Sequence, residues 1–271
     1  MILAGPPGSE NAAPFIAVEQ VQVTYGQGSA EPVRALSDIN FAVPEGAFVS
    51  LIGPSGCGKS TLLRAVGDLL TPSSGRITIG GTPAAELRQK GRIGVVFQQP
   101  NLMPWLRIED NVRLLHRLVS DANSKAGIPT PDVEGLLRLV GLEGFGRKRP
   151  AQLSGGMQSR AALARALALD PAILLMDEPF AALDEITRDR MGIELMRIHA
   201  SFRKTVLFVT HSLAEAVFLS DSIVLMTPRP GRIARIIPVD LPRPRLPEMR
   251  LTDEFARMVA ELNRELYRMM A

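Results

Sequence analysis

The chain of 271 residues has one cysteine, which excludes a whole class of small folds. With only Cys57 present, no disulfide can form within the chain, so a disulfide-held scaffold is ruled out. A lone thiol also agrees with a reducing compartment. Cys57 lies in a glycine-rich segment, where it is either a small tolerated side chain or a redox-reactive thiol, and the pattern favours the first.

The sequence also lacks any apolar run near the ~20 residues that a helix needs to cross a bilayer. The strongest run, at residues 173–176, has the length of a strand. We therefore expect any link to a membrane to come through a partner. Residues 1–14 have no basic start and no sustained apolar stretch, so they predict a flexible tail and not a signal peptide. Together these features predict a cytoplasmic protein.

Neither sign of charge dominates the sequence. Lys and Arg number 31 against 28 Asp and Glu, for a formal net charge of +3. The basic residues are scattered, and the short cluster at 147–149 is typical of a solvated face, so we expect no nucleic-acid partner. Hydrophobic residues make up 46% of the chain, which at this length supports a substantial core in one large or two small domains.

The periodicity of apolar residues predicts an α/β fold. Apolar and polar residues alternate at 15–25, 33–43 and 76–79, which predicts an N-terminal antiparallel sheet. Continuous apolar runs between helical stretches predict buried parallel strands. These runs are residues 48–52, 93–97, 173–176 and 206–209. From about residue 100 to 169 the spacing becomes helical, so we expect an inserted helical subdomain.

The C-terminal part predicts a strand pair, a linker and a helix. The strands, at 223–226 and 232–239, are joined by a Pro-Arg-Pro-Gly turn, and a proline-rich linker follows at 241–247. Thr252 is placed to cap a last helix. Its apolar stripe most often indicates docking on the chain's own core, with a partner surface as the alternative.

Residues 53–61 read Gly-Pro-Ser-Gly-Cys-Gly-Lys-Ser-Thr and match the P-loop pattern between a predicted strand and a predicted helix. Glycines let consecutive backbone N–H groups surround an anion at the positive end of a helix. The lysine neutralises the outer phosphates and the serine binds Mg²⁺, whereas a plain turn needs neither. The predicted nucleotide-binding residues are Gly53, Pro54, Ser55, Gly56, Cys57, Gly58, Lys59, Ser60 and Thr61.

Two further segments carry chemistry. Asp177 and Glu178 follow the apolar strand at 173–176; one carboxylate would serve a metal, and two suggest two roles. The segment Leu-Ser-Gly-Gly-Met at 153–157 precedes a helix that we expect to reach about residue 169. Alone, it could simply cap that helix. Its hydroxyl and unpaired N–H groups also suit a phosphate.

In this order, the P-loop and residues 153–157 resemble the ATP-binding subunit of an ABC transporter, over about residues 18–240. The resemblance implies a P-loop NTPase (ABC ATPase) core, with the antiparallel β subdomain and the helical insert, over 15–240. A tail at 1–14 would precede it, and the linker and amphipathic helix at 241–271 would follow. ATP and Mg²⁺ are the implied cofactors. A homodimer is also implied, because residues 153–157, which match the family's signature motif, complete in each copy the nucleotide site of the other copy.

The resemblance also assigns roles to the acids and their neighbours. Asp177 would hold Mg²⁺, partly through water, while Glu178 acts as general base. Gln98, more than the adjacent Gln99, matches a glutamine that senses Mg²⁺ and the attacking water. His211 matches a switch histidine at the γ-phosphate. The implied metal-binding set is Ser60, Gln98 and Asp177.

Other matching positions would bind nucleotide or the second copy. Tyr25 would stack on adenine, with a core tyrosine as the alternative. Asp184 would contact the opposite subunit. The signature residues Ser154, Gly155 and Gly156 would meet the γ-phosphate held by that subunit. The remaining histidines, His116 and His199, fall in predicted helices and are interpreted as surface or packing residues.

Finer segments resemble the nitrate, sulfonate and taurine branch of bacterial importers. They lie at 102–105, 183–188, 208–211, 215–219 and 228–232. The implied function is ATP hydrolysis that energises a membrane importer for a small anionic solute. Transmembrane permease subunits would be the direct partners, a solute-binding protein an indirect one, and the location peripheral, at the cytoplasmic face of the inner membrane.

The chain departs from that branch at a few positions, and two other functions compete with it. Residues 158–160, Ala181 and Ser212 differ from its usual pattern, which affects the signature helix and the switch segment. A soluble ABC ATPase acting on nucleic acid or ribosomes would usually carry two cassettes or a long coiled coil. A P-loop small-molecule kinase would not need the signature.

Overall fold

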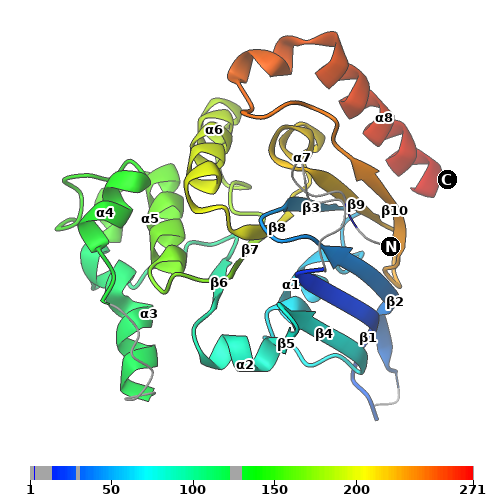
Figure 1. The fold of residues 1–271 in the computed structure, drawn as a ribbon, viewed down its shortest axis with the longest axis horizontal. Helices are drawn as coiled ribbons and strands as arrows, with labels where there is room; N and C mark the ends of the chain where they lie inside the picture. Colours follow the sequence, from blue (N-terminus) through cyan, green and yellow to red (C-terminus); the bar gives the residue numbers. More distant parts are fainter. Residues whose placement is uncertain (1–2, 4–13, 29–30, 123–129, 271) are drawn as a thin grey trace. The chain divides into compact units, whose positions relative to one another are not determined.

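The structure is a computed structural model that describes residue 3 and residues 14–28, 31–122 and 130–270. The chain forms two compact units, with elements labelled as in Figure 1. The first unit contains residues 1–86 and 205–271, and the second contains residues 87–204. Each unit is described separately.

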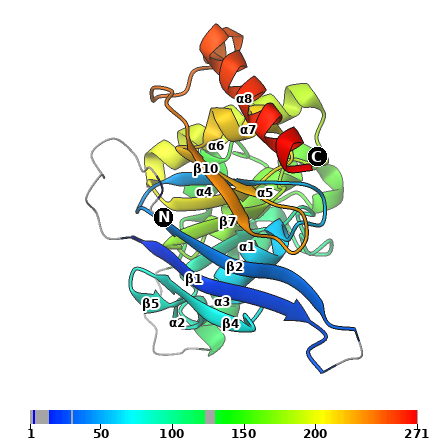
Figure 2. The same cartoon turned by 90° about the vertical axis from the view of Figure 1, so that its right-hand side faces the viewer.

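An antiparallel sheet forms the N-terminal part of the first unit. Figure 2 shows its two long strands lying side by side, and Ile16 on the central strand pairs with both Val43 and Ile79. Buried and more exposed side chains alternate along these strands, so the period-two pattern confirms the predicted antiparallel sheet. In sheet order, the strands are β2 (Val33–Val43), β1 (Ile16–Tyr25), β4 (Ser74–Ile79) and β5 (Thr82–Pro83).

A second set of strands in this unit is almost wholly buried. Strand β3 (Phe48–Ile52) pairs in parallel with β8 (Thr205–Val209) and with β9 (Ser222–Met226), and all their residues are buried. Strand β10 (Ile233–Pro238) pairs with β9 in antiparallel orientation. The apolar runs are continuous because both faces of these strands are covered.

Helices of the first unit pack around these strands. They are α1 (Lys59–Val66), α7 (Leu213–Leu219) and α8 (Asp253–Met270), with a 3-10 turn at Pro247–Leu251 before α8. At the start of α8, Thr252 Oγ1 accepts the Phe255 N–H at 3.3 Å, which is the predicted cap. Phe255 and Leu262 are buried, and α8 packs against α7. The apolar stripe therefore covers the chain's own core.

The second unit combines two parallel strands with helices. Strand β6 (Ile93–Val96) pairs with β7 (Ile173–Asp177). Figure 1 shows α3, α4 and α5 side by side, and each of them contacts the other two. The helices are α3 (Ile108–Ala122), α4 (Val133–Leu139), α5 (Gly155–Leu167) and α6 (Glu185–Phe202), with a 3-10 turn at Pro150–Gln152.

Three details differ from the sequence expectations. Strand β6 ends one residue early, at Val96, and a short helix α2 (Ala84–Gln89), which no pattern predicted, spans the boundary between the units. Most of the predicted tail at 1–14 lies outside the described residues. Leu3, however, is buried, and its N–H donates to the Ala42 carbonyl at 3.0 Å. At that residue the chain is held against β2.

Candidate active site

The P-loop connects β3 to α1 within the first unit. Gly56 and Gly58 have φ angles of 74° and 106°, the left-handed region that glycine adopts without strain. A side chain at Gly53 would also collide with the loop's surroundings, since its Cβ would lie 2.7 Å from the Met226 carbonyl oxygen. These glycines are required for the loop to turn directly into the first turn of α1.

Lys59 is the first residue of α1 and is only 7% exposed. Its ammonium donates to the carbonyl oxygens of Gly53 (2.8 Å) and Pro54 (3.0 Å) and lies 3.8 Å from the Cys57 sulfur. Bending back over the loop, the side chain places a positive charge where the loop's backbone N–H groups are expected to hold phosphates.

Tyr25 ends β1 beside the first turn of α1. Its hydroxyl and the Thr61 hydroxyl form a hydrogen bond at 3.2 Å. The residue is 42% exposed, so it is not a core tyrosine, and the alternative raised from the sequence does not apply. The structure thus brings together the two predicted ends of a nucleotide site, for the base and for the phosphates.

His211 is exposed and follows β8 by one residue after Thr210. The residues on either side of it are fixed. The Thr210 hydroxyl donates to the buried Glu215 carboxylate and accepts the Ser212 N–H at 3.0 Å. Ser212 in turn caps α7 by accepting the Glu215 N–H at 3.3 Å. Sequence reasoning did not predict that Glu215 holds the residues around His211, although Glu215 lies only four residues after His211 in the sequence.

The other predicted residues lie in the second unit. Asp177 is the last residue of β7 and is 8% exposed, and Glu178 follows it with a φ of 46°. A left-handed backbone at a residue other than glycine is uncommon. The next turn is closed by the Ala181 N–H, which donates to the Glu178 carbonyl at 3.1 Å. The backbone that carries the two carboxylates therefore leaves the buried strand through a tight, strained turn.

The signature segment has the capping geometry predicted for it. The Ser154 hydroxyl oxygen accepts the Met157 N–H at 3.3 Å, and Gly155 and Gly156 are the first residues of α5. A Cβ at Gly156 would lie 3.2 Å from the Thr187 Cγ2, tighter than ordinary packing. Ser154 and Gly155 are exposed, so the N-terminus of α5 is open to a ligand.

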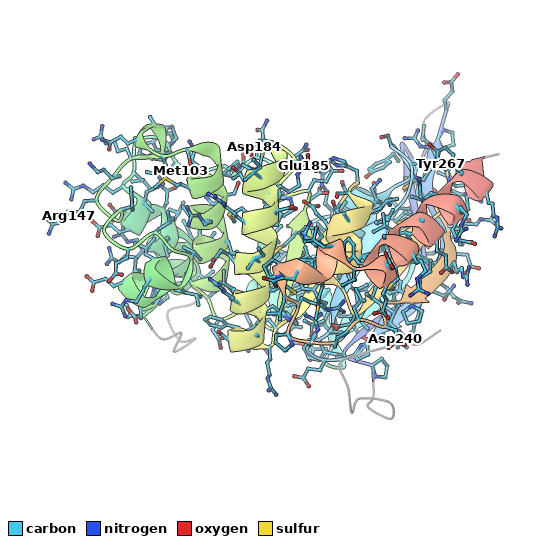
Figure 3. The ribbon with its side chains drawn as sticks, turned by 90° about the horizontal axis from the view of Figure 1, so that it is seen from above. Met103, Arg147, Asp184, Glu185, Asp240 and Tyr267 are labelled. Atoms are coloured by element: carbon cyan, nitrogen blue, oxygen red, sulfur yellow. The ribbon has the colours of Figure 1, made fainter. Side chains whose placement is uncertain are left out.

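Asp184 caps α6 in the same way. Its carboxylate accepts the Thr187 N–H at 2.9 Å, and hydrogen bonding by Thr187 lowers the pKa of Asp184 below its ordinary value. Figure 3 labels Asp184 and Glu185 at the N-terminal end of α6, and both are exposed. A residue expected to meet another subunit thus has a fixed backbone and an accessible side chain.

Gln98 lies two residues after the end of β6, and both it and Gln99 are exposed, so burial does not distinguish them. The segment that follows is anchored by Arg165 of α5, which sequence reasoning missed. Its guanidinium donates to the carbonyl oxygens of Pro100 and Asn101, both at 2.7 Å. Burial lowers the pKa of the Arg165 guanidinium from its ordinary value.

Comparison with known proteins identifies the family of this chain. The ABC transporter family matches residues 36–181, which include the P-loop, the signature and both carboxylates. The chain belongs to the ABC transporter family. This ABC ATPase is 43% identical over 239 residues to an aliphatic sulfonates import ATP-binding protein of Burkholderia cenocepacia, covering 88% of this chain and 83% of that protein.

Two other similarities extend the comparison. A taurine import ATP-binding protein of Rhizobium johnstonii is 43% identical over 233 residues, 84% of this chain and 86% of that protein. A solved dimeric ATP-binding cassette in a post-hydrolysis state, bound to ADP and Pi, is 33% identical with a TM-score of 0.69. That match covers 83% of this chain and 99% of the other. The fold of this ABC ATPase is therefore that of known cassettes.

Proposed function

We propose that this ABC ATPase energises a membrane importer for a small anionic solute of the sulfonate, taurine or nitrate type. The observation that carries this proposal is the pairing of a P-loop, with Lys59 bent over it, and an open helix N-terminus at Ser154. The solute class rests on the sulfonate and taurine import proteins, each 43% identical to this chain.

Residues of the first unit would bind the nucleotide. Tyr25 would stack on the base, because its ring is partly exposed beside the P-loop helix. Lys59 would leave the Gly53 and Pro54 carbonyls and pair with the outer phosphates. The remaining residues from 53 to 61 would surround the phosphates with backbone N–H groups.

The residues that match the family's catalytic positions would provide the hydrolytic chemistry. Glu178 would accept a proton from the attacking water, and His211 would report on the γ-phosphate from a loop that Glu215 holds in place. Gln98 would position that water near the phosphate. The 15–240 ATPase region, with its helical part at about 100–169, would thus carry the whole reaction.

Ser60, Gln98 and Asp177 would hold Mg²⁺. The donor set fits, since hydroxyl, amide and carboxylate oxygens suit Mg²⁺, which is usually bound through one or two carboxylates together with substrate phosphates and water. In the part of the chain that the structure describes, no three His, Cys, Asp or Glu residues form a metal-binding group, so a cage made of protein alone is not offered there. Bound there, the ion would neutralise charge on the phosphates.

The working form would be a homodimer in which Ser154, Gly155 and Gly156 of one copy meet the phosphates of the other. Asp184 would lie at the contact between the copies. A related cassette is dimeric in its post-hydrolysis state, which supports this arrangement. Transmembrane permease subunits would bind the dimer at the cytoplasmic face of the membrane, and a solute-binding protein would act through them. Among the described helices, none has both the length and the apolarity to cross a bilayer.

The decisive experiment is co-purification of the tagged chain with membrane proteins, followed by reconstitution in vesicles. We expect a multispanning permease to co-purify and ATP hydrolysis to rise when an anionic solute and its binding protein are added. Phosphoryl transfer to a small-molecule acceptor would instead favour a kinase. Stimulation by nucleic acid or ribosomes, without a permease, would favour the other alternative.

A further inference from the structure

The turn between β9 and β10 lies against the outside of the P-loop. We call residues 227–232 the backing turn. The Thr227 N–H donates to the Arg232 carbonyl and the Arg232 N–H donates to the Thr227 hydroxyl, both at 3.0 Å. Gly231 also joins the turn to β2, because its N–H donates to the Ala35 carbonyl at 2.9 Å and its carbonyl accepts the Ser37 N–H at 3.0 Å. The turn is thus fixed at both ends.

Gly231 leaves no room for a side chain beside the P-loop. A Cβ built there would lie 2.0 Å from the Cys57 carbonyl oxygen and 3.3 Å from its carbonyl carbon. The difference, 3.3 minus 2.0 or 1.3 Å, is about the length of a C=O bond (~1.23 Å). The Cys57 carbonyl therefore points almost straight at the position where a side chain on Gly231 would begin.

The direction of that carbonyl determines where the next N–H group points. In a trans peptide the C=O and the following N–H are antiparallel, so the Gly58 N–H points away from the backing turn. Gly58 is the N-cap of α1, where N–H groups are expected to meet phosphates. We propose that Gly231 is a positioning residue for phosphate binding: its bare α-carbon admits the Cys57 carbonyl and so aims the Gly58 N–H into the phosphate site.

A second contact from the same hairpin supports the other end of the loop. A Cβ at Gly53 would meet the Met226 carbonyl oxygen at 2.7 Å and the Met226 Cβ at 3.2 Å. Met226 ends β9 directly before the backing turn, and its Cε would lie 3.2 Å from a Cβ at Gly231. The hairpin therefore braces the loop at Gly53 and again at Cys57.

The test is Gly231→Ala, compared with Arg229→Ala, an exposed position in the same turn. The added methyl would lie 2.0 Å from the Cys57 carbonyl oxygen, so the Cys57 peptide must shift and the Gly58 N–H is turned off its phosphate. Losing one hydrogen bond to a charged group is expected to cost on the order of 10- to 100-fold in affinity. ATP and ADP affinity would be measured by calorimetry, and kcat and KM at one subunit concentration. We expect KM and Kd to rise in Gly231→Ala, kcat at saturating ATP to stay within about threefold, and Arg229→Ala to match the parent.

A purely structural role of Gly231 would give the opposite pattern: a lower melting temperature without nucleotide, and a lower kcat with unchanged KM. That result, or an unchanged ATP affinity, overturns the proposal.

If Gly231→Ala does not fold, Thr227→Val is the second test, since it loosens the turn without adding bulk. Weaker ATP binding at an unchanged melting temperature then supports the proposal, and parental binding overturns it. The inference rests on the proposed nucleotide site, which Lys59→Ala tests separately. If the parent chain binds no ATP, both the proposed nucleotide site and the proposed role of Gly231 are wrong.

Discussion

The Arg165 guanidinium donates to the Asn101 carbonyl at 2.7 Å, which ties the helix that begins at the signature to the segment that follows Gln98. A second branch of the same guanidinium reaches the Pro100 carbonyl at the same distance. A planar fork can hold two adjacent carbonyls in one orientation, which an ammonium cannot do. The Arg165 side chain therefore connects the segment after Gln98 to the signature helix.

Replacing Arg165 with Met should lower the free energy of unfolding by about 1–2 kcal/mol, because two charge-assisted hydrogen bonds are lost while a buried charge is also removed. Stimulation of ATP hydrolysis by the permease should fall more than basal hydrolysis. The matched control is Arg160→Met on the same helix, since Arg160 donates to the Val140 and Gly141 carbonyls instead. Equal loss of stimulation in both variants would contradict a specific coupling role.

Glu178→Gln should retain ATP binding and nearly stop hydrolysis, because an amide cannot accept the proton of the attacking water.

Lys59→Ala should instead abolish productive ATP binding, since the positive charge held at the P-loop is gone. Equilibrium binding and single-turnover hydrolysis would separate these effects. Rapid turnover in the Gln variant would remove Glu178 as the base.

Mixing two inactive chains tests whether the site is shared between copies. A Lys59→Ala chain still offers an intact Ser154, and a Ser154→Arg chain still offers an intact P-loop. Their mixture should recover one working site per mixed dimer, and the specific activity of the parent should rise with protein concentration. A verified monomer with concentration-independent turnover would contradict the shared site.

Alkylation of Cys57 should be slow in the folded protein, because this P-loop residue is only 1% exposed. We expect ATP to slow it further and denaturant to speed it strongly, as followed by mass spectrometry. Once attached, the reagent should block nucleotide binding by filling the loop. A Cys57→Ala chain that is still inactivated would show that the reagent acts elsewhere.

Asp170 should make stability depend on pH. Its carboxylate accepts hydrogen bonds from Lys204 (2.7 Å) and Arg92 (3.2 Å), and the hydrogen bond from Lys204 is the main cause that lowers its pKa. The ionised form therefore stabilises the fold above the unfolded value of about 3.9, and this contribution is lost as pH falls through the folded pKa.

Asp170→Asn should accordingly lower the melting temperature at pH 7, by an amount equivalent to about 0.5 kcal/mol, because the Asp170 carboxylate is largely exposed to solvent. The parent and the variant should converge as the pH falls below the folded pKa of Asp170. Glu134→Gln, at an exposed acid on α4, is the control and should show little difference at either pH. A gap that persists in acid would contradict an ionic origin.

Local patterns were enough to predict the elements that form the site. The run at 48–52 is apolar except for Ser50 and is flanked by turn residues, and it forms β3 with the predicted bounds. Ser154 and Thr252 were predicted as caps and are caps, because an N-cap depends only on the three following residues. Burial does not separate Gln98 from Gln99, so that choice still depends on resemblance.

Contacts between distant segments could not be predicted in this way. Arg165 occupies an ordinary helical position, and nothing in its spacing indicates that it reaches Asn101, 64 residues away. Gly231 could be interpreted only as a turn glycine, since its need for a bare α-carbon comes from Cys57 on a different element. Such residues are specified by tertiary packing, to which a single sequence gives no local signal.

At Glu178, the left-handed backbone lowers the stability of the fold at the same position where the proposed general base stands. A residue with a Cβ in that conformation costs on the order of 1 kcal/mol, and glycine would remove the cost. A Glu178→Gly chain would be free of that strain but would lack the proposed general base. Selection for activity would thus keep a non-glycine residue in the left-handed region directly after Asp177, although another residue there would fold with less strain.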